Sequence, residues 1–392
     1  MSRPCDMTAD LFTPIRLGDI ELPNRVVMAP LTRNRAEQPG NVPQPINATY
    51  YAQRASAGLI ITEGAPISEM AHGYPDTPGI HSAAQIAGWK RVTDTVHAKG
   101  GRIVLQLWHV GRISHPSLLP DGALPVAPSA IKPAGKAFTR RGRMEFVTPR
   151  ALEAWEIPGL IESFRIAADN AKSAGFDGIE VHGANGYLLD QFLRDGSNHR
   201  TDRYGGSIAN RARLLQEVLM VVCEVWGAGR VGVRISPLNQ YNDMRDSNPQ
   251  ALFNGVADAL RPFGLAYLHV MERDVHGSEL PFDFDELRRR FDGRYMANGG
   301  YDKQRANASI AMRRADCVAF GNAYIANPDL VERYAQDAPL NVADPSTLYG
   351  GREQGYTDYP ALADYHISRR RSPSHCYCAT APASRRCRSS AR

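Results

Sequence analysis

The chain has 392 residues, of which 43% are hydrophobic and 22% are charged. This composition is typical of a folded globular protein with a large buried core, and it excludes wholesale disorder and fibrous folds. No run approaches the 18 consecutive apolar residues of a membrane-spanning helix, and the N-terminal stretch MSRPCDMTADLF lacks the apolar segment of a secretory signal. We therefore expect a cytoplasmic protein that does not bind membranes.

The net charge of +5 is concentrated at the C-terminal end of the chain. Residues 365–392 hold seven arginines and no acidic residue, which leaves 39 of the 46 basic residues elsewhere against all 41 acidic ones. The body is thus nearly neutral and gives no indication of nucleic-acid binding. Residues 366–392, rich in Ser, Arg and Ala, are predicted to form a disordered tail. The body's cysteines, Cys5, Cys223 and Cys317, indicate reduced thiols in a reducing compartment.

Eight short runs rich in apolar and β-branched residues recur along the body, and each has the length of a buried strand. They are RVVMAP from 25, LIITEG from 59, RIVLQLWH from 102, GIEVHG from 178, VGVRISP from 231, YLHVME from 267, YMANGG from 295 and DCVAFGN from 316. Between them lie helical patterns, one starting at a capping box of Ser82 and Gln85 and another behind a Ser207 cap. We also expect Asn327 to cap a helix whose first residue is Pro328.

This alternation predicts an α/β fold, a (β/α)8 TIM barrel that forms one domain over residues 11–362. The alternative, an open doubly wound sheet, lacks support because no G-x-G-x-x-G motif follows the first strand. The interval after the third strand is roughly 40 residues longer than an ordinary strand–helix unit. Its residues 110–157 are expected to form an excursion over the barrel mouth, because they follow the C-terminal end of a strand.

The loops after the last two strands carry glycines. The seventh strand ends in Asn298, Gly299 and Gly300, and the eighth ends in Gly321 and Asn322. Barrels commonly bind phosphate at these two loops, where glycines let backbone N–H groups approach the oxyanion. The sequence therefore predicts a phosphorylated ligand, with tight strand-to-helix turns as the alternative use of the glycines.

Two polar residues lie inside otherwise apolar strand runs. Arg234 lies in VGVRIS, where a buried cation without a partner costs several kcal/mol. We expect its acceptor to be either a carboxylate, such as Glu63 or Glu180, or an electron-rich ligand over the barrel mouth. Gln106, near the end of the third strand, can offer a donor and an acceptor to the edge of a heterocycle, or can have a purely structural role.

Three polar side chains follow the fourth strand in the motif HGANGY. His182 and Asn185 are three residues apart, and Tyr187 is two residues further on. Two hydrogen-bond donors aimed at one oxygen polarise a carbonyl, and a phenol with a pKa of about 10 delivers a proton without losing it early. A lone histidine at a strand end is more often structural, but three such side chains at a barrel mouth favour a catalytic group.

Residues that are absent narrow the chemistry further. None of the eight runs contains lysine, which argues against Schiff-base aldolase chemistry. The first strand has no H-x-H motif, and we expect no metal site. No serine or cysteine stands in an evident nucleophile motif. What remains is a site that binds a phosphate, accommodates a polar heterocycle and polarises a carbonyl.

Several motifs follow one another between about Leu11 and Leu362. They are LFTPIRLGDIELPNRVVMAPLTR, TEG, GYPDTPGI, QLWHVGR, HGANGYLLDQFLRDGSNHRTDRYGGS, VGVRISP, ANGGY, AFGNAYIANPDL and GYTDYP. In this order they resemble the old yellow enzyme family of FMN-dependent ene-reductases. Within that family the chain looks most like the bacterial branch of N-ethylmaleimide, pentaerythritol tetranitrate and glycerol trinitrate reductases. The resemblance implies FMN as cofactor and NADPH, or less well NADH, as hydride donor.

The resemblance also implies a role for each candidate residue. It places Pro30, Leu31 and Thr32 beside the flavin ring, Ala65 and Gln106 at its pyrimidine edge, Arg234 at N1 and O2, and Asn298, Gly299, Gly300, Gly321 and Asn322 around the phosphate. It implies that His182 and Asn185 grip a carbonyl or nitro oxygen of the substrate, that Tyr187 donates a proton, and that Tyr74, Trp108 and Tyr356 shape the substrate pocket.

The reaction that the resemblance implies has two halves at one site. A reduced nicotinamide gives hydride to the flavin and leaves, and an α,β-unsaturated aldehyde, ketone, imide or nitroalkene then takes hydride at its β-carbon. Tyr187 adds a proton at the α-carbon. Nitrate esters and nitroaromatics are further expected acceptors. The expected partners are therefore small molecules, and the protein is expected to be a monomer or a homodimer.

One departure from the family pattern concerns the phosphate. Where the family usually has Gly-Arg after the eighth strand, with the arginine on the phosphate, this chain has Gly321 followed by Asn322. The loss of a charge-assisted pair is expected to weaken cofactor retention about tenfold to a hundredfold, unless backbone amides suffice. His81 stands where related chains often have Trp. Two other functions stay open: a colourless barrel isomerase or lyase acting on a sugar phosphate, and a non-catalytic flavin-binding sensor.

Overall fold

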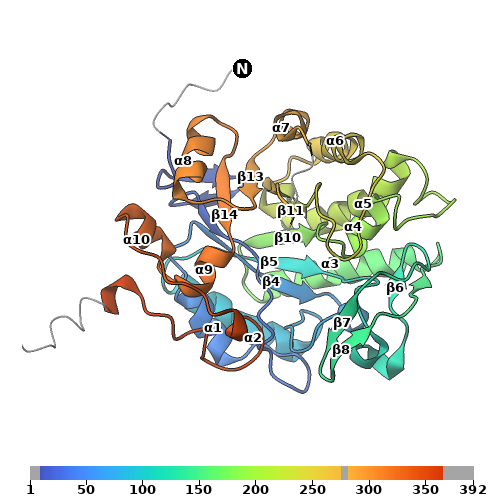
Figure 1. Ribbon diagram of the computed structural model, residues 1–392, viewed down its shortest axis with the longest axis horizontal. Coiled ribbons are helices and arrows are strands. Elements are labelled where there is room, and N and C mark those ends of the chain that lie inside the picture. The colour runs from blue at the N-terminus through green and yellow to red at the C-terminus, as the bar shows by residue number, and fades with distance from the viewer. Residues whose placement is uncertain (1–8, 275–280, 365–392) are drawn as a thin grey trace, which may run out of the picture.

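The structure, a computed structural model, describes residues 9–274 and 281–364, so the predicted tail at 366–392 lies outside the described residues (Figure 1). Eight parallel strands close into a barrel, in which each strand pairs with the next barrel strand along the chain and the last pairs with the first. They are β3 (Val26–Met28), β4 (Leu59–Pro66), β5 (Ile103–Trp108), β10 (Gly178–His182), β11 (Val231–Ile235), β12 (Tyr267–Met271), β13 (Tyr295–Asn298) and β14 (Cys317–Phe320). The predicted (β/α)8 barrel is confirmed, and each of the eight predicted runs contains one barrel strand.

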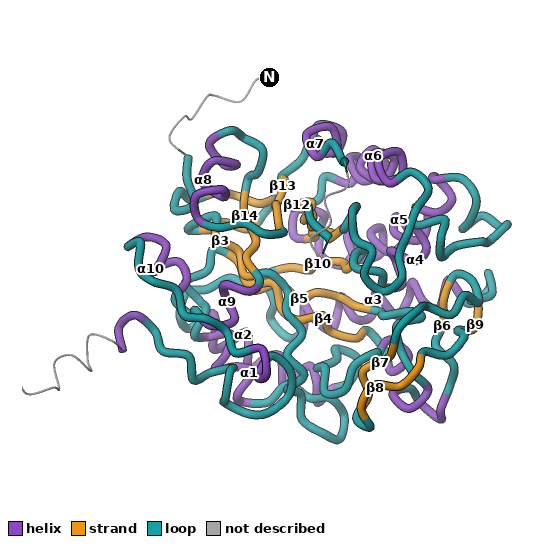
Figure 2. Tube along the Cα trace, in the orientation of Figure 1, coloured by secondary structure: helices purple, strands orange, loops and turns teal. Residues whose placement is uncertain are grey.

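Helices surround the strands on the outside of the barrel (Figure 2). The α-helices are α1 (Pro45–Ala52), α2 (Ala83–His97), α3 (Ile157–Ser173), α4 (Leu188–Leu193), α5 (Ile208–Trp226), α6 (Pro249–Leu260), α7 (Phe284–Phe291), α8 (Lys303–Ala311), α9 (Asn322–Ala326) and α10 (Leu330–Ala335). Short 3-10 helices are η1 (Glu69–Ala71), η2 (Pro116–Leu118), η3 (Pro120–Gly122), η4 (Ala228–Arg230), η5 (Arg261–Phe263) and η6 (Pro345–Thr347). In the described part of the chain, no helix is long and apolar enough to cross a membrane.

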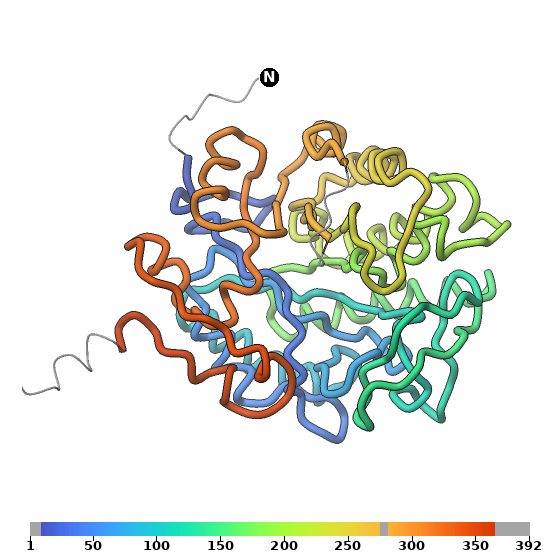
Figure 3. Tube along the Cα trace, viewed as in Figure 1, coloured from blue at the N-terminus to red at the C-terminus, as the bar shows by residue number. Residues whose placement is uncertain are grey.

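The last described segment lies beside the beginning of the chain, where the red and blue ends of the colour scale meet (Figure 3). Arg33, in the loop after β3, donates to the carbonyl of Leu348 at 2.9 Å. Arg54, just after α1, donates to the carbonyls of Tyr324 at 3.1 Å and Ile325 at 3.0 Å. These contacts tie α9 and the residue after η6 to the first strand–helix unit.

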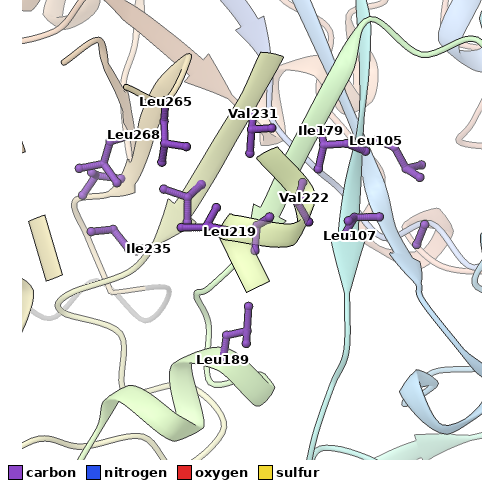
Figure 4. Packing of buried hydrophobic residues seen from close by; sticks show 14 of the residues in the cluster. Leu105, Leu107, Ile179, Leu189, Leu219, Val222, Val231, Ile235, Leu265 and Leu268 are labelled. Carbon is purple, nitrogen blue, oxygen red and sulfur yellow. The ribbon is translucent and has the colours of Figure 1, made fainter. Parts of the chain in front are cut away.

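The two-residue period of the strands divides their side chains between the helices and the barrel interior. Leu105 and Leu107 of β5 and Ile179 of β10 are fully buried in the layer between strands and helices, as are Leu219 and Val222 of α5 (Figure 4). Burying a side chain of this size stabilises the fold by about 1.5–3 kcal/mol. This layer explains why each strand run is apolar almost throughout.

The barrel interior changes from apolar to polar along the strands. At the N-terminal end, the hairpin of β1 (Ile15–Leu17) and β2 (Ile20–Leu22) packs against inward-facing residues such as Leu59 and Val104. Two residues after Val104, the same face of β5 presents Gln106. The hairpin therefore closes the bottom of the barrel with apolar side chains, and the polar positions gather at the C-terminal end.

The N-terminal ends of the helices can be compared with the N-cap residues predicted from the sequence. Ser82 and Gln85 form the predicted capping box of α2, and the Ser207 hydroxyl accepts from the backbone of Asn210 at the start of α5. The predicted cap at Asn327 is wrong, because α9 ends at Ala326 and α10 begins after Asp329. The Asn327 amide is instead used between segments, since it donates to the carbonyl of Ala323 at 2.8 Å and accepts from the backbone of residue 341 at 2.7 Å.

The excursion at residues 110–157 contains four short strands: β6 (Val126–Ala127), β7 (Lys136–Thr139), β8 (Gly142–Glu145) and β9 (Arg150–Ala151). β7 and β8 form an antiparallel hairpin, and β6 pairs with β9. Ala137 on the hairpin and Phe146 just after it pack against Trp108, at the end of β5, and Tyr187. The excursion therefore covers the C-terminal end of the barrel, as predicted.

The barrel interior has no room for a side chain at Gly232 of β11. A Cβ there would lie 2.2 Å from the fully buried ring of Tyr267. We expect Gly232→Ala to lower the free energy of unfolding by about 1–3 kcal/mol, as overpacked cores do, measured from urea unfolding. Gly159→Ala is the control, because a Cβ at this helical position meets nothing within 4 Å. Equal stability of the two variants would contradict this account.

Candidate active site

Strand pairing brings polar residues that are far apart in sequence to one end of the barrel. His182 on β10 lies opposite Arg234 on β11, and Glu180 on β10 lies opposite Gln106 on β5. None of these four side chains is more than 5% exposed. Since the strands are parallel and the residues lie in register, the positions predicted from three separate motifs form one polar layer at the barrel mouth.

Aromatic rings form a wall beside this layer. The ring of Trp108 stacks with Tyr74 at 5.6 Å between centroids and meets Tyr187 edge-on at 4.9 Å. The His182 ring lies 5.1 Å from the Tyr187 ring. Trp108 fits here because the neighbouring strand has Gly64, where a Cβ would lie 2.8 Å from the indole. Four predicted residues from three motifs, Tyr74, Trp108, His182 and Tyr187, thus surround one space.

Several buried polar atoms of this wall lack a hydrogen-bond partner within residues 9–274 and 281–364. They are His182 Nδ1, Asn185 Oδ1 and Trp108 Nε1. A buried polar atom that stays unpaired costs about 1–3 kcal/mol, so a cluster of them indicates a place where a ligand completes the hydrogen bonds. Burial lowers the pKa of His182 well below its usual range, with Arg234 adding to the effect. The imidazole is therefore neutral and keeps one donor and one acceptor nitrogen.

The loop after β10 holds Asn185 in one conformation. Its backbone is left-handed, with φ of 59°, its N–H donates to Ser236 Oγ at 2.7 Å, and its carbonyl accepts from Asn242 Nδ2 at 2.8 Å. At the loop's start, the Gly183 N–H donates to the Arg234 carbonyl at 2.9 Å. With its backbone satisfied on both sides, Asn185 keeps its side-chain amide free for the site.

Tyr187 is the residue best placed to exchange a proton. Its hydroxyl lies 3.1 Å from the hydroxyl of Tyr74. Burial raises the pKa of Tyr187 well above its ordinary value, and the nearby Tyr241 and Tyr349 raise it further, while a hydrogen bond with Asn242 opposes them. The phenol therefore stays protonated until an acceptor of high proton affinity forms. Tyr241, Asn242 and Tyr349 were not predicted. The available signal was the position of Tyr241 and Asn242 in the loop after β11, because loops at the C-terminal ends of the strands form the barrel mouth.

Arg234 has no carboxylate partner in this layer. Its Nη2 donates to Asn298 Oδ1 at 3.1 Å, and its Nε has no partner in the described ranges. Burial lowers the pKa of Arg234, although Glu180 favours its charged form from a distance. Of the two acceptors considered from the sequence, Glu63 instead accepts from the Arg33 backbone at 3.3 Å and from Tyr51 at 3.4 Å. The structure therefore favours a ligand as the partner of this guanidinium.

Glu180 has its own partners, which the sequence did not reveal. Its Oε1 accepts from Gln106 Nε2 at 2.7 Å, and its Oε2 lies 2.8 Å from His269 Nδ1. Burial lowers the pKa of His269, so the imidazole is neutral and Nδ1 donates to the carboxylate. The sequence did contain a signal for this network. Glu180 in GIEVH and His269 in YLHVM are polar residues in apolar strands, and alternate positions of a strand share one face. This network fixes the amide of Gln106 at the floor of the site.

The loop after β13 has a backbone that glycine allows and that a ligand can approach closely. Gly299 and Gly300 have φ of 111° and 69°, which residues with a Cβ rarely adopt. Gly321 directly follows β14, and Asn322 begins α9. A Cβ at Gly321 would lie 3.4 Å from Leu31 Cδ2, so the loop after β3 reaches this end of the site. Asn298 joins the two regions, since it donates to the Ala319 carbonyl at 2.6 Å while accepting from Arg234.

The residues assigned to the flavin ring lie around the same mouth. Pro30, Leu31 and Thr32 lie directly after β3 and are partly exposed. Ala65 is on β4, opposite Leu107, and both side chains belong to the core between strands and helices. Any contact of Ala65 with a ligand in the barrel mouth must therefore use its backbone.

Tyr356 lies in a different place from the one expected. Its ring is fully buried, stacks on Tyr50 at 4.0 Å between centroids, and lies 4.4 Å below the Arg35 guanidinium. Its hydroxyl accepts from Asn47 at 2.9 Å. We therefore assign Tyr356 to the packing that supports the mouth. Tyr349, which is 60% exposed, instead lines a cavity of about 280 Å³ together with Pro75, Phe138 and other residues of the rim.

These residues fit a flavin nucleotide. The unpaired Arg234 Nε and the fixed Gln106 amide suit the polar edge of the ring, and the positive-φ glycines suit the phosphate. A barrel with this site belongs to the class of flavin-dependent oxidoreductases. The chain belongs to the NADH:flavin oxidoreductase / NADH oxidase family, which matches residues 10–341, and this confirms the resemblance to the old yellow enzymes. FMN is therefore the cofactor of this oxidoreductase.

Similar proteins span nearly the whole chain. Putative 12-oxophytodienoate reductase 11 of Oryza sativa subsp. japonica is 46% identical over 363 residues, which cover 91% of this chain and 98% of that protein. The solved structure of morphinone reductase with tetrahydroNAD has a TM-score of 0.87 and 51% identity, over 92% of this chain and 99% of that one. The old yellow enzyme homologue of Zymomonas mobilis has a TM-score of 0.87 and 42% identity, over 90% and 100%. Membership of the bacterial branch of N-ethylmaleimide, pentaerythritol tetranitrate and glycerol trinitrate reductases, which the motifs led us to expect, stays a prediction.

Glu63 gives the stability of the protein a specific dependence on pH. Burial raises its pKa from 4.5 to about 7, against the opposing effect of the Arg33 backbone hydrogen bond. The folded protein therefore holds this proton more tightly than the unfolded chain, and stability falls as pH rises from about 4.5 to 7. We expect Glu63→Gln to remove about 3 kcal/mol of this fall, measured by urea unfolding across that range. Exposed Glu224→Gln is the control, and parallel pH profiles for all three proteins would contradict the assignment.

Proposed function

We propose that this chain reduces the activated C=C bond of α,β-unsaturated carbonyl and nitro compounds, with FMN as cofactor and NADPH or NADH as hydride donor. The observation that carries the proposal is the position of His182 and Asn185, whose unpaired polar atoms lie beside the Tyr187 phenol. Relatives named 12-oxophytodienoate reductase and morphinone reductase support it, since both names denote carbonyl compounds. Nitrate esters and nitroaromatics are a second substrate group that the same hydride donor serves.

FMN, when bound, supplies the hydride chemistry by accepting two electrons from a nicotinamide and giving them to the substrate. Arg234 would face the edge of the ring where negative charge collects. Because no carboxylate of the polar layer pairs with this buried cation, its charge would be available to stabilise the negative charge of the ring. Gln106, held by Glu180, would present its amide to the same edge. Gly300 and Gly321 would let backbone N–H groups reach the phosphate.

The substrate's oxygen is bound by His182 and Asn185 in this proposal. Hydrogen bonds from both side chains draw electron density toward the carbonyl or nitro oxygen, which makes the β-carbon a better hydride acceptor. Tyr187 then donates its phenolic proton to the α-carbon. Its raised pKa keeps the proton in place until the carbanion character develops, and Tyr74, 3.1 Å away, orients the hydroxyl.

We propose NADPH as the favoured donor because the rim of the mouth is basic. The β7–β8 hairpin carries the exposed residues Arg140, Arg141 and Arg143. Arg140 is paired with Asp76 at 2.8 Å, which fastens the hairpin to the loop that follows Tyr74. Exposed guanidinium groups at this rim attract the additional phosphate of NADPH, which NADH lacks.

We also propose a cytoplasmic location and a monomer or homodimer without nucleic-acid or membrane partners. The free thiols of Cys223 and Cys317 support a reducing compartment, and Cys5 lies outside the described residues. Membership of an oxidoreductase family leaves no role for the sugar-phosphate isomerase or lyase considered above. The proton donor and the oxygen-binding pair favour an enzyme over a flavin-binding sensor.

An anaerobic titration tests the proposed function directly. We expect the purified protein to absorb near 450 nm, to bleach faster with NADPH than with equal NADH, and to regain its colour on addition of an enone or nitroalkene. A saturated ketone of the same size is the control acceptor and should restore no colour. Bleaching without recovery in the presence of every activated alkene would contradict the proposal.

Replacement of Tyr187 by Phe tests the proton donor. We expect the variant to slow reoxidation by an enone about a hundredfold, because a general acid contributes about 10²–10⁴-fold, and to leave reduction by NADPH unchanged. Stopped-flow absorbance measures the two half-reactions separately. Tyr334→Phe on α10 is the matched control. Equal slowing of both half-reactions in the Tyr187 variant would show that the phenol has another role.

A further inference from the structure

Two arginines from different strand–helix units converge on the glycine loop after β13. Arg273 follows β12, and Arg305 lies in the first turn of α8. A Cβ at Gly300 would lie 3.1 Å from Arg273 Nη1 and 3.7 Å from Arg305 Nη1. Both guanidinium groups therefore lie against the backbone of the same residue, at the end of the site where the structure has its positive-φ glycines.

Within the described residues, Arg305 forms one ion pair, and that pair is long. Arg305 donates to the carbonyls of Gly299 at 3.4 Å and Gly300 at 3.2 Å, and its Nη2 lies 3.9 Å from Glu272 Oε2. Glu272 is shared, because it also accepts from the phenols of Tyr295 and Tyr301. The carboxylate that pairs with Arg305 is thus also bound by two phenols. An anion between Arg273 and Arg305 would stabilise both cations.

The loop after β14 does not supply a cation of its own. Asn322, the first residue of α9, is neutral and exposed, and Gly321 precedes it. Backbone N–H groups alone would leave a phosphate of nearly two negative charges without a charged partner at this loop. Arg273 is exposed, and in the described part of the chain it forms no ion pair that would hold it away from the loop.

We propose that Arg273 and Arg305 together bind the phosphate of the flavin cofactor. This inference rests on the proposed function, because it takes the flavin nucleotide as the ligand. Arg305 is held in place by the carbonyls of Gly299 and Gly300, so it forms a fixed side of the phosphate site. Arg273, on the neighbouring loop, lies against the same residue, Gly300, and would supply the second cation of the site. The charge that the start of α9 lacks is supplied from the loop after β12 and from α8.

The test compares two ligands that differ only in the phosphate. Apoprotein is titrated with FMN and with riboflavin, and the quenching of flavin fluorescence gives each dissociation constant. In Arg273→Ala and in the double variant Arg273→Ala/Arg305→Ala, we expect FMN affinity to fall about tenfold to a hundredfold and riboflavin affinity to stay the same. Arg289→Ala on α7 is the matched control, since its side chain is 68% exposed and lies away from the glycine loop.

Two further measurements support or overturn the assignment. High salt should reduce the difference between the affinities for FMN and for riboflavin. This reduction should be larger in the unaltered protein than in the double variant, because the arginine contacts are exposed and are screened by salt. Asn322→Arg in the double variant should restore part of the FMN affinity. An unchanged FMN-to-riboflavin ratio in both variants overturns the proposal, as does equal loss of both ligands. Failure of the unaltered protein to bind either flavin would instead refute the proposed function on which it rests.

Discussion

The structure depends on a guanidinium that the barrel buries without a carboxylate. Arg234 is 5% exposed, and its one neutral hydrogen-bond partner, Asn298, leaves Nε unpaired within the described ranges. A cation in such a place costs stability unless a ligand balances it. The apolar layer between strands and helices and the hairpin that closes the bottom of the barrel stabilise the fold. Their contribution offsets the cost of burying the Arg234 cation. The Arg234 guanidinium thus lacks a full set of partners until the cofactor binds.

Glu180 lies on the neighbouring strand, two residues from the position opposite Arg234, and yet does not pair with this cation. Gln106 and His269 occupy its two oxygens, at 2.7 and 2.8 Å, so the carboxylate forms no ion pair with the guanidinium in the described residues. If Glu180 were free to pair with Arg234, the charge available to a reduced flavin would be smaller. The neutral partners therefore have an electrostatic role as well as a structural one, since they bind the carboxylate oxygens that would otherwise be available to Arg234.

The sequence was sufficient for the barrel and for the gathering of polar residues at one end of it, because both follow from periodicity and order along the chain. Eight buried runs and the polar residues at their ends were visible as patterns, and each pattern led to a strand or a loop at the mouth. Contacts between side chains were not visible in this way. The partners of Glu180, the use of Asn327 between segments and the burial of Tyr356 against Tyr50 depend on which segments pack together, and no single stretch of residues encodes that.

The two ends of the site differ in the kind of charge they offer. At the ring end, Arg234 comes from a barrel strand and is buried, so its position is fixed by the sheet and its field is little screened by solvent. At the phosphate end, the cations come from loops and a helix start, and they are exposed to salt. The contacts with the flavin ring can thus stay the same while the contacts with the phosphate change. A residue at the rim can be substituted without repacking the barrel. The neutral Asn322 is an instance of such an exchange, since nothing in the core depends on its side chain.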